Sequence, residues 1–286
     1  MIDFIGNDAK KNTLYENEIP YRIVCNMVKM YWSNQYKMEL YKYGLMLIKP
    51  EAIIMGKAYE IFTILHAAGF ELIYLVHKNL DATCVSEMWK FSWQNSSLEH
   101  ILVNQKLFSV YDSLILILRL QNSGTKSACK MLTDLKGSAL ESKRNPHQIR
   151  WKIRPINYML NYVHTSDNSN DFLREIGILL NWDELIQAFE AIVSNRVIAY
   201  PKIEKMTLPK QDYTLTNWLN NICEKIKVSS ISTSDKNYVM KYIQVLKKHT
   251  EAQVTLNFLR VLCQYNLIEW DFETIVILSN NINYLE

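Results

Sequence analysis

Several features that define common protein classes are missing from this 286-residue sequence. The five cysteines lie far apart and form no Cys-x-x-Cys pair, so we expect no zinc site. No apolar stretch approaches the roughly 18 to 20 residues that a membrane span needs, so no membrane association is expected. The opening residues, MIDFIGNDAKKN, carry acid early and no long apolar core, which does not fit a secretory signal. These absences favour a cytoplasmic protein with reduced thiols.

A strong charge of either sign is also missing. The formal net charge is +3, which is too mild to predict nucleic-acid binding, although it suits an anionic ligand. Hydrophobic residues make up 49% of the chain and charged residues 21%, as in a globular protein rather than a disordered one. The length predicts one large domain, or one domain with extensions.

Short apolar strands and amphipathic helices alternate in the middle of the sequence. Strands are expected at residues 43–48, 70–77, 113–120 and 159–163. Helices are expected at residues 57–68, 81–108 and 124–136, and again after the Ser-Asp-Asn cluster 166–170. The stretch 137–155 carries no clear period and is expected to be a long loop. This order predicts an α+β sandwich, with one sheet and helices on one face.

The chain divides into four predicted parts. Residues 1–42 form an N-terminal helical extension, residues 43–195 the α+β domain, residues 196–212 a linker, and residues 213–286 a helical C-terminal domain. In the last part, apolar residues recur at helical spacing, and these stripes are expected to be core or a packing surface.

The most informative motif surrounds a histidine. Asn161-Tyr162-Val163-His164-Thr165-Ser166-Asp167 is similar to the Asn-x-x-His-Gly-Ser-Asp signature of the nucleoside diphosphate kinase family, with threonine in place of the usual glycine. Glu175 follows His164 by eleven residues, which is the family spacing for the glutamate that orients the histidine.

Two upstream segments extend the resemblance. Ile48-Lys49-Pro50-Glu51 resembles the Ile-Lys-Pro-Asp start of the family domain, and Ile149-Arg150 resembles its Thr-Ile-Arg segment. Trp89 falls where the family usually has a tyrosine near the histidine, although a tryptophan is more often a core residue. The resemblance covers residues 43 to about 190, roughly half of the chain.

The resemblance implies a ferredoxin-like antiparallel sheet with helices, plus an α-helical C-terminal segment here. It also implies a kinase in which His164 takes the γ-phosphate of ATP or another nucleoside triphosphate, with Mg²⁺, as a phosphohistidine. Lys49 and Arg150 would contact phosphates, while Asn161 would reach a ribose hydroxyl and Trp89 the ligand.

The chemistry of the residues agrees with that role. A neutral imidazole is a competent nucleophile near pH 7, and it needs a partner on its other nitrogen, which Glu175 can provide. Ser166 is expected to hydrogen-bond Glu175. Phosphoryl transfer mostly requires positioning and charge neutralisation, which suits Lys49 and Arg150. No metal ligand set is assigned to the protein itself.

Departures from the family pattern leave alternatives open. Thr133 and Ala139 stand where the family has a phosphate-binding arginine and a phosphate-contacting threonine, and residues 96–98 lack the aromatic that stacks on the base. One alternative is an enzyme that acts on a second, non-nucleotide acceptor or transfers a nucleotidyl group. Another is a catalytically weak nucleotide-binding interaction module. The family is usually oligomeric, so a homo-oligomer is possible, and the added helices can alter it.

Overall fold

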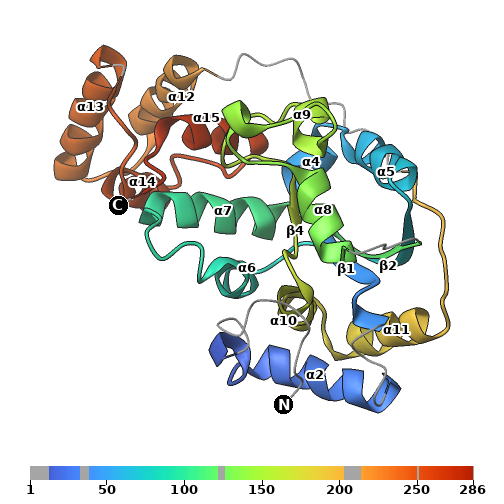
Figure 1. Ribbon diagram of the computed structural model, residues 1–286. Helices are drawn as coiled ribbons and strands as arrows, with labels where there is room; N and C mark the ends of the chain where they lie inside the picture. The colour runs from blue at the N-terminus through green and yellow to red at the C-terminus, as the bar shows by residue number, and fades with distance from the viewer. Residues whose placement is uncertain (1–12, 33–38, 122–125, 203–213, 250, 286) are drawn as a thin grey trace. The chain divides into compact units, whose positions relative to one another are not determined.

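The computed structural model of the chain describes residues 13–32, 39–121, 126–202, 214–249 and 251–285. Residues 203–212 of the predicted linker lie outside this part of the chain, and so do residues 1–12 and 33–38 of the predicted N-terminal extension. Figure 1 labels the helices and strands in chain order.

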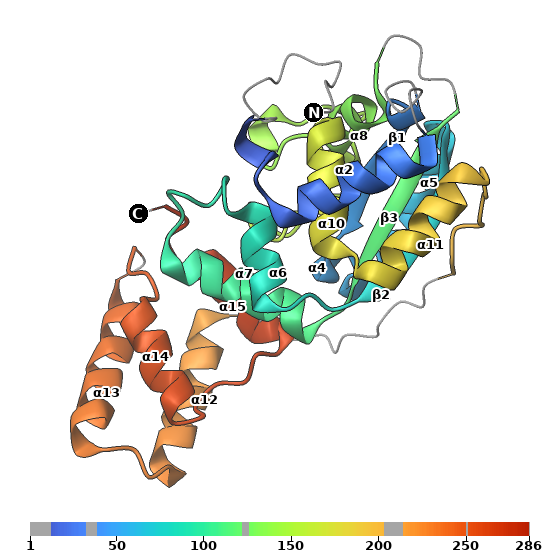
Figure 2. The ribbon, with the colours of Figure 1, turned by 90° about the horizontal axis from the view of Figure 1, so that it is seen from below.

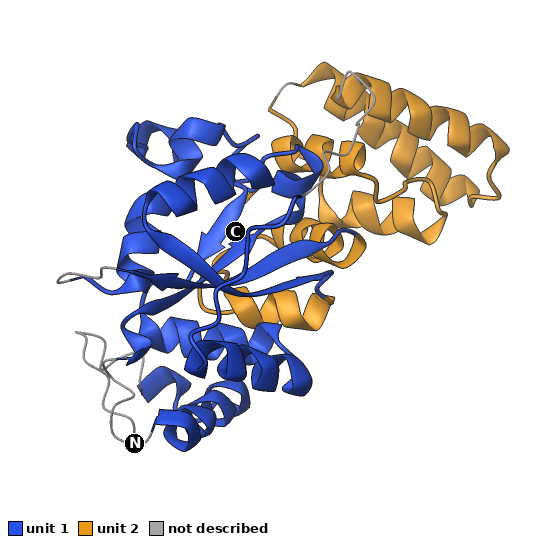
Figure 3. Ribbon diagram, turned by 90° about the vertical axis from the view of Figure 1, so that its right-hand side faces the viewer, with its two compact units in different colours: residues 1–80, 111–206 blue, residues 81–110, 207–286 orange. Residues whose placement is uncertain are grey.

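The chain forms two compact units, each made of two separate stretches of sequence (Figure 3). The sheet unit holds residues 1–80 and 111–206, and the helical unit holds residues 81–110 and 207–286. Residues 81–110, which lie within the predicted domain of residues 43–195, form one compact unit with the C-terminal helices, and the domain bounds expected from the sequence stay a prediction.

The sheet unit is built on a four-stranded antiparallel sheet. In sheet order its strands are β2 (Phe70–Lys78), β3 (Ser113–Leu120), β1 (Tyr43–Ile48) and β4 (Val163–Thr165). Leu47 of β1 lies opposite Ile115 of β3 on one side and His164 of β4 on the other. The predicted ferredoxin-like α+β fold is therefore confirmed, and its register places His164 beside the central strand β1.

The last strand differs from its prediction. A strand was expected at residues 159–163, but β4 spans Val163–Thr165, so His164 lies within the strand rather than after it. Two features keep the preceding residues out of the sheet. The side chain of Asn157 accepts hydrogen bonds from the backbone N–H groups of Met159 and Leu160, and Tyr162 has a left-handed backbone with φ of 73°.

Helices cover both faces of the sheet, not one face as the sequence suggested. One face carries α4 (Pro50–Ile54), α5 (Ala58–Ala67), α8 (Ala128–Lys136) and α9 (Ile149–Ile153). The other face carries α2 (Ile19–Trp32), α10 (Ser169–Leu179) and α11 (Trp182–Val193), as Figure 2 shows. Every residue of β1 is consequently buried, whichever way its side chain points. A continuous apolar run, rather than an alternating one, is the pattern of a strand covered on both faces.

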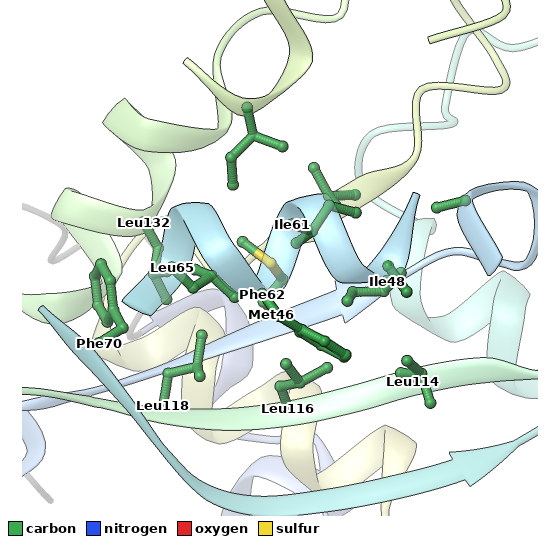
Figure 4. Packing of buried hydrophobic residues seen from close by; sticks show 14 of the residues in the cluster. Met46, Ile48, Ile61, Phe62, Leu65, Phe70, Leu114, Leu116, Leu118 and Leu132 are labelled. Atoms are coloured by element: carbon green, nitrogen blue, oxygen red, sulfur yellow. The ribbon is translucent and has the colours of Figure 1, made fainter. Parts of the chain in front are cut away.

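The core between β1, β3 and α5 positions the strand that pairs with His164. Figure 4 shows Met46 and Ile48 of β1 beside Leu116 of β3, with Ile61 and Leu65 of α5 packed above them. All five side chains are fully buried. Burial of each such side chain contributes about 1.5–3 kcal/mol, which holds β1 firmly in place.

The helical unit joins the α6–α7 segment to the C-terminal helices. Its elements are α6 (Ala82–Trp89), α7 (Leu98–Val110), α12 (Leu215–Val228), α13 (Thr233–Lys248), α14 (Leu256–Gln264) and α15 (Phe272–Asn281). The predicted C-terminal helices are confirmed, and their apolar stripes are largely buried. Residues 81–108, which were expected to be helical, form the two helices α6 and α7. Among the described helices, none has both the length and the apolar character needed to cross a lipid bilayer.

Polar contacts tie the start of α7 to the end of the chain. The Ser97 hydroxyl donates to the Asn283 carbonyl at 2.5 Å, and the backbone N–H of Leu256 donates to Glu99 Oε1 at 2.6 Å. The segment between α6 and α7 is therefore held by residues more than 150 positions later in the sequence.

Candidate active site

His164 and Glu175 form the centre of the candidate site. The Nε2 atom of His164 lies 2.9 Å from Glu175 Oε1, and the His164 side chain keeps 21% of its surface exposed. Helix α10 brings Glu175 to this position. That helix begins just after Asn168, whose side chain accepts the backbone N–H groups of Asn170 and Asp171 as an N-cap.

Ser166 holds the other oxygen of the carboxylate. Its hydroxyl donates to Glu175 Oε2 at 2.5 Å, while its backbone N–H donates to Leu45 of β1 at 3.3 Å. A carboxylate can only accept hydrogen bonds, so in the neutral ring Nε2 of His164 carries the proton. Nδ1 then carries the lone pair, and it is the nitrogen available for nucleophilic attack.

Lys49 lies at the end of β1, at the N-terminus of α4, and is almost completely buried. Its ammonium donates to the Met159 carbonyl at 2.7 Å and lies 3.1 Å from Glu51 Oε1. Burial lowers the pKa of Lys49, Glu51 opposes that shift, and the charge of Arg150 adds to it. The expected phosphate contact is thus a lysine already engaged by protein oxygens.

Arg150, in α9, is also engaged by its own chain. Its guanidinium donates to the carbonyls of Gly137 and Val163 at 2.9 and 2.5 Å, and to the carbonyl and side-chain oxygens of Asn161 at 3.1 and 2.8 Å. Four of its five N–H groups are used in this way. Burial, followed by the neighbouring charge of Arg144, lowers its pKa to about 10.

Two further expected residues have different surroundings. The side-chain oxygen of Asn161 accepts from Arg150, and its N–H group donates to the Tyr158 carbonyl at 2.8 Å. Trp89 belongs to the helical unit, where its ring centroid lies 5.4 Å from that of Trp93 and 5.1 Å from that of Phe108. The expected ligand contacts of Asn161 and Trp89 stay predictions.

Two charged residues gain importance in the structure. Glu51 is fully buried, and its Oε1 accepts from the backbone N–H of Tyr162 at 3.0 Å as well as contacting Lys49. It therefore connects Lys49 to the segment just before His164. Its place directly after Lys49-Pro50 was the only sequence signal. Lys136 lies at the end of α8, and its ammonium is 3.7 Å from Asp167 Oδ1.

Thr133, on α8, contacts the end of β4 through a neutral hydroxyl. Its hydroxyl lies 3.2 Å from the Thr165 hydroxyl and 3.1 Å from Asp167 Oδ1. It thereby links α8 to the end of β4 without supplying a positive charge.

The described residues contain no group of three or more His, Cys, Asp and Glu side chains suited to a metal ion. Near His164, Glu175 is committed to the imidazole and Ser166, and Asp167 to Thr133 and Lys136.

The sheet unit is thus an antiparallel α+β domain that holds a histidine oriented by a carboxylate. The family model described as nucleoside diphosphate kinase matches residues 42–185, half of the chain. The chain belongs to the nucleoside diphosphate kinase family. The comparison with curated proteins gave no match.

Solved structures of nucleoside diphosphate kinases resemble the chain at low identity. The enzyme from Aquifex aeolicus is 18% identical, with 50% of this chain and 97% of that chain covered and a TM-score of 0.42. The enzyme from Borrelia burgdorferi, solved with vanadate and ADP, is 15% identical, with 56% and 92% covered and a TM-score of 0.43. The enzyme from Halobacterium salinarum, in complex with CDP, is 15% identical, with 56% and 93% covered and a TM-score of 0.43.

Proposed function

We propose that this chain is a nucleotide-dependent phosphotransferase that moves the γ-phosphate of a nucleoside triphosphate through a phosphohistidine at His164. The observation that supports the proposal is the Ser166–Glu175–His164 chain of hydrogen bonds, with its distances of 2.5 and 2.9 Å. It leaves Nδ1 of His164 as the nucleophile on a partly exposed side chain.

The proposed reaction has two steps. The Nδ1 lone pair of His164 forms a bond to the γ-phosphorus, the bond from that phosphorus to the bridging oxygen breaks, and the nucleoside diphosphate leaves with those electrons. A second nucleoside diphosphate then attacks the same phosphorus and frees the ring. The ring gains positive charge as the N–P bond forms, and the carboxylate of Glu175 stabilises that charge.

The nucleotide phosphates would meet Lys49 and Arg150. The family generally uses a triphosphate with Mg²⁺, and Mg²⁺ is commonly held by substrate phosphates together with few protein carboxylates.

The test is incubation with γ-labelled ATP, followed by measurement of acid-labile label on the protein. We expect label on the wild type and none on the His164→Ala variant. Exposed His66 on α5 provides the matched control, because His66→Ala removes a histidine outside the site and should label normally. A wild type without label, or equal labelling of His164→Ala, would reject the proposal.

A second candidate function is supported by the engaged cations. Lys49 and Arg150 both donate to protein oxygens, so a triphosphate must compete with the Met159 and Gly137 carbonyls. This geometry also fits a catalytically weak nucleotide-binding module. Calorimetry with ATP and ADP beside a turnover assay separates the two functions: tight binding without turnover favours the module, and rapid turnover excludes it.

A further inference from the structure

Lys136 has an unusual combination of burial and poor pairing. Its side chain is only 13% exposed at the C-terminal end of α8. Its closest acidic atom, Asp167 Oδ1, lies at 3.7 Å, which is too far for a normal hydrogen bond. That oxygen already accepts from the Thr133 hydroxyl at 3.1 Å, and the Asp167 side chain is 59% exposed. The mostly buried ammonium of Lys136 thus has one long ion pair, to an Asp167 carboxylate that is exposed and already engaged.

The ammonium of Lys136 is not sealed in the interior. Among the described residues, the fully enclosed side-chain atoms without a hydrogen-bond partner are Glu51 Oε2, Ser113 Oγ and Gln253 Oε1. Lys136 Nζ is not one of them, and its long ion pair with Asp167 leaves the ammonium able to donate to a further acceptor. The Lys136 side chain keeps 13% of its surface exposed, so an external acceptor can approach it from solvent.

The charges around Lys136 belong to the candidate active site. The negative charges of Asp167 and Glu175 attract its ammonium, and the positive charge of Arg150 repels it. Glu175 is the partner of His164, so Lys136 lies within electrostatic range of the histidine's own carboxylate. Two mostly buried cations, Lys136 and Arg150, repel each other in the free protein, and an anion placed between them would relieve that repulsion.

We propose that Lys136 is a phosphate-binding residue of this site, whose ammonium donates to an oxygen of the nucleotide's polyphosphate chain. The proposal rests on the proposed function for the identity of the anion. Thr133, one turn earlier on α8, offers only a neutral hydroxyl that is already engaged by Thr165 and Asp167. Lys136 is thus the residue through which α8 brings positive charge to the phosphates.

The first test is binding of ATP and of inorganic tripolyphosphate by calorimetry. Lys136→Met has a side chain of similar length without the charge. It should weaken the binding of ATP and of tripolyphosphate about ten- to a hundredfold, as expected for a hydrogen bond between charged groups. Lys136→Arg should retain most of the affinity. Lys130 on the same helix is 56% exposed and pairs with Asp134, so Lys130→Met is the matched control and should bind like the wild type. Wild-type affinity in Lys136→Met would overturn the proposal.

The second test separates ligand binding from a structural role. A buried and poorly paired ammonium costs stability in the free protein, so Lys136→Met should raise the Tm without nucleotide. The same variant should show a smaller Tm increase on addition of ATP than the wild type does. If the ion pair with Asp167 were instead the purpose of Lys136, the variant would melt at a lower temperature with an unchanged response to ATP, and the proposal would fail.

The two proposals can fail separately. A wild type that takes no label but binds ATP more tightly than Lys136→Met would reject the transfer at His164 and retain the role of Lys136. A wild type that takes label, with Lys136→Met binding and labelling equally well, would reject Lys136 alone. A wild type that binds neither ATP nor tripolyphosphate would overturn both.

Discussion

The carboxylate of Glu175 lies 2.9 Å from Nε2 of His164, and this contact fixes which ring nitrogen carries the proton in the neutral ring. In Glu175→Gln the side chain keeps its size but loses the charge that stabilises the phosphorylated ring. We expect the rate of His164 labelling to fall by roughly ten- to a hundredfold, because hydrogen bonds to charged groups contribute about 1.5–3 kcal/mol. Single-turnover labelling with γ-labelled ATP measures the rate. Ser166→Ala, which leaves the charge in place, should have a smaller effect, and an unchanged rate in Glu175→Gln would contradict the orienting role.

The buried cations predict opposite pH effects on binding and on stability. Burial holds the pKa of Lys136 below its ordinary value of 10.5, so on the alkaline side the folded protein loses this proton before the unfolded chain does. The free energy of unfolding should therefore rise with pH between the lowered pKa and 10.5, and Lys49 contributes with the same sign. ATP affinity should fall over that window, because the neutral amine no longer attracts phosphate.

Calorimetry with ATP at a series of alkaline pH values checks the binding effect. Lys136→Arg supplies the control, because a guanidinium stays protonated at higher pH than an ammonium. Its affinity should persist to higher pH than that of the wild type. Superimposable pH profiles for the two proteins would show that Lys136 does not titrate with binding.

Gly177 allows α2 to pack directly on α10, the helix that carries Glu175. A Cβ at this position would lie 2.5 Å from the backbone carbonyl oxygen of Pro20 and 3.0 Å from a methyl group of Val24. Gly177→Ala should lower the free energy of unfolding by about 1–3 kcal/mol, although alanine ordinarily favours helices. Urea denaturation measures it. Because the tightest contact is with backbone, adding Val24→Ala should not rescue the variant, and a gain in stability would contradict this packing.

An ion pair between Arg174 and Glu18 joins α10 to the segment just before α2. Arg174 Nε lies 2.6 Å from Glu18 Oε2, and the two side chains are 3% and 12% exposed. Glu18→Ala should destabilise the protein by up to about 3 kcal/mol, because the buried guanidinium loses its carboxylate. Thermal unfolding tests this, with Glu16→Ala as a control at a neighbouring, partly buried acid. Equal Tm values for the two variants would contradict the structural role of the pair.

The sequence allowed the sheet and the centre of the site to be predicted because both depend on local patterns. The apolar runs at 43–48 and 113–120 became β1 and β3, with the predicted bounds. His164 and Glu175 were paired because their spacing matches that of the family, and a strand followed by a capped helix converts this spacing into a contact. Both signals lie within short stretches of chain.

The features that could not be predicted depend on distant contacts. β4 starts later than predicted because Tyr162 adopts a left-handed backbone. The backbone N–H of Lys49 donates to the Tyr162 carbonyl, and the Tyr162 N–H donates to the Glu51 carboxylate. The engagement of Arg150 by Gly137 and Val163 arises from a loop that carries no sequence period. Nor did any local signal indicate that residues 81–110 group with the last helices.

The divided composition of the helical unit has a consequence for how the protein is made. Residues 81–110 leave the ribosome long before residues 207–286, with which they share a core. Until synthesis ends, α7 lacks α15, the helix that packs against it, and its apolar face stays exposed in a partly finished chain. Synthesis must therefore reach the last helices before this half of the molecule can fold, and we expect a shortened chain ending near residue 206 to leave the face of α7 that packs against α15 uncovered.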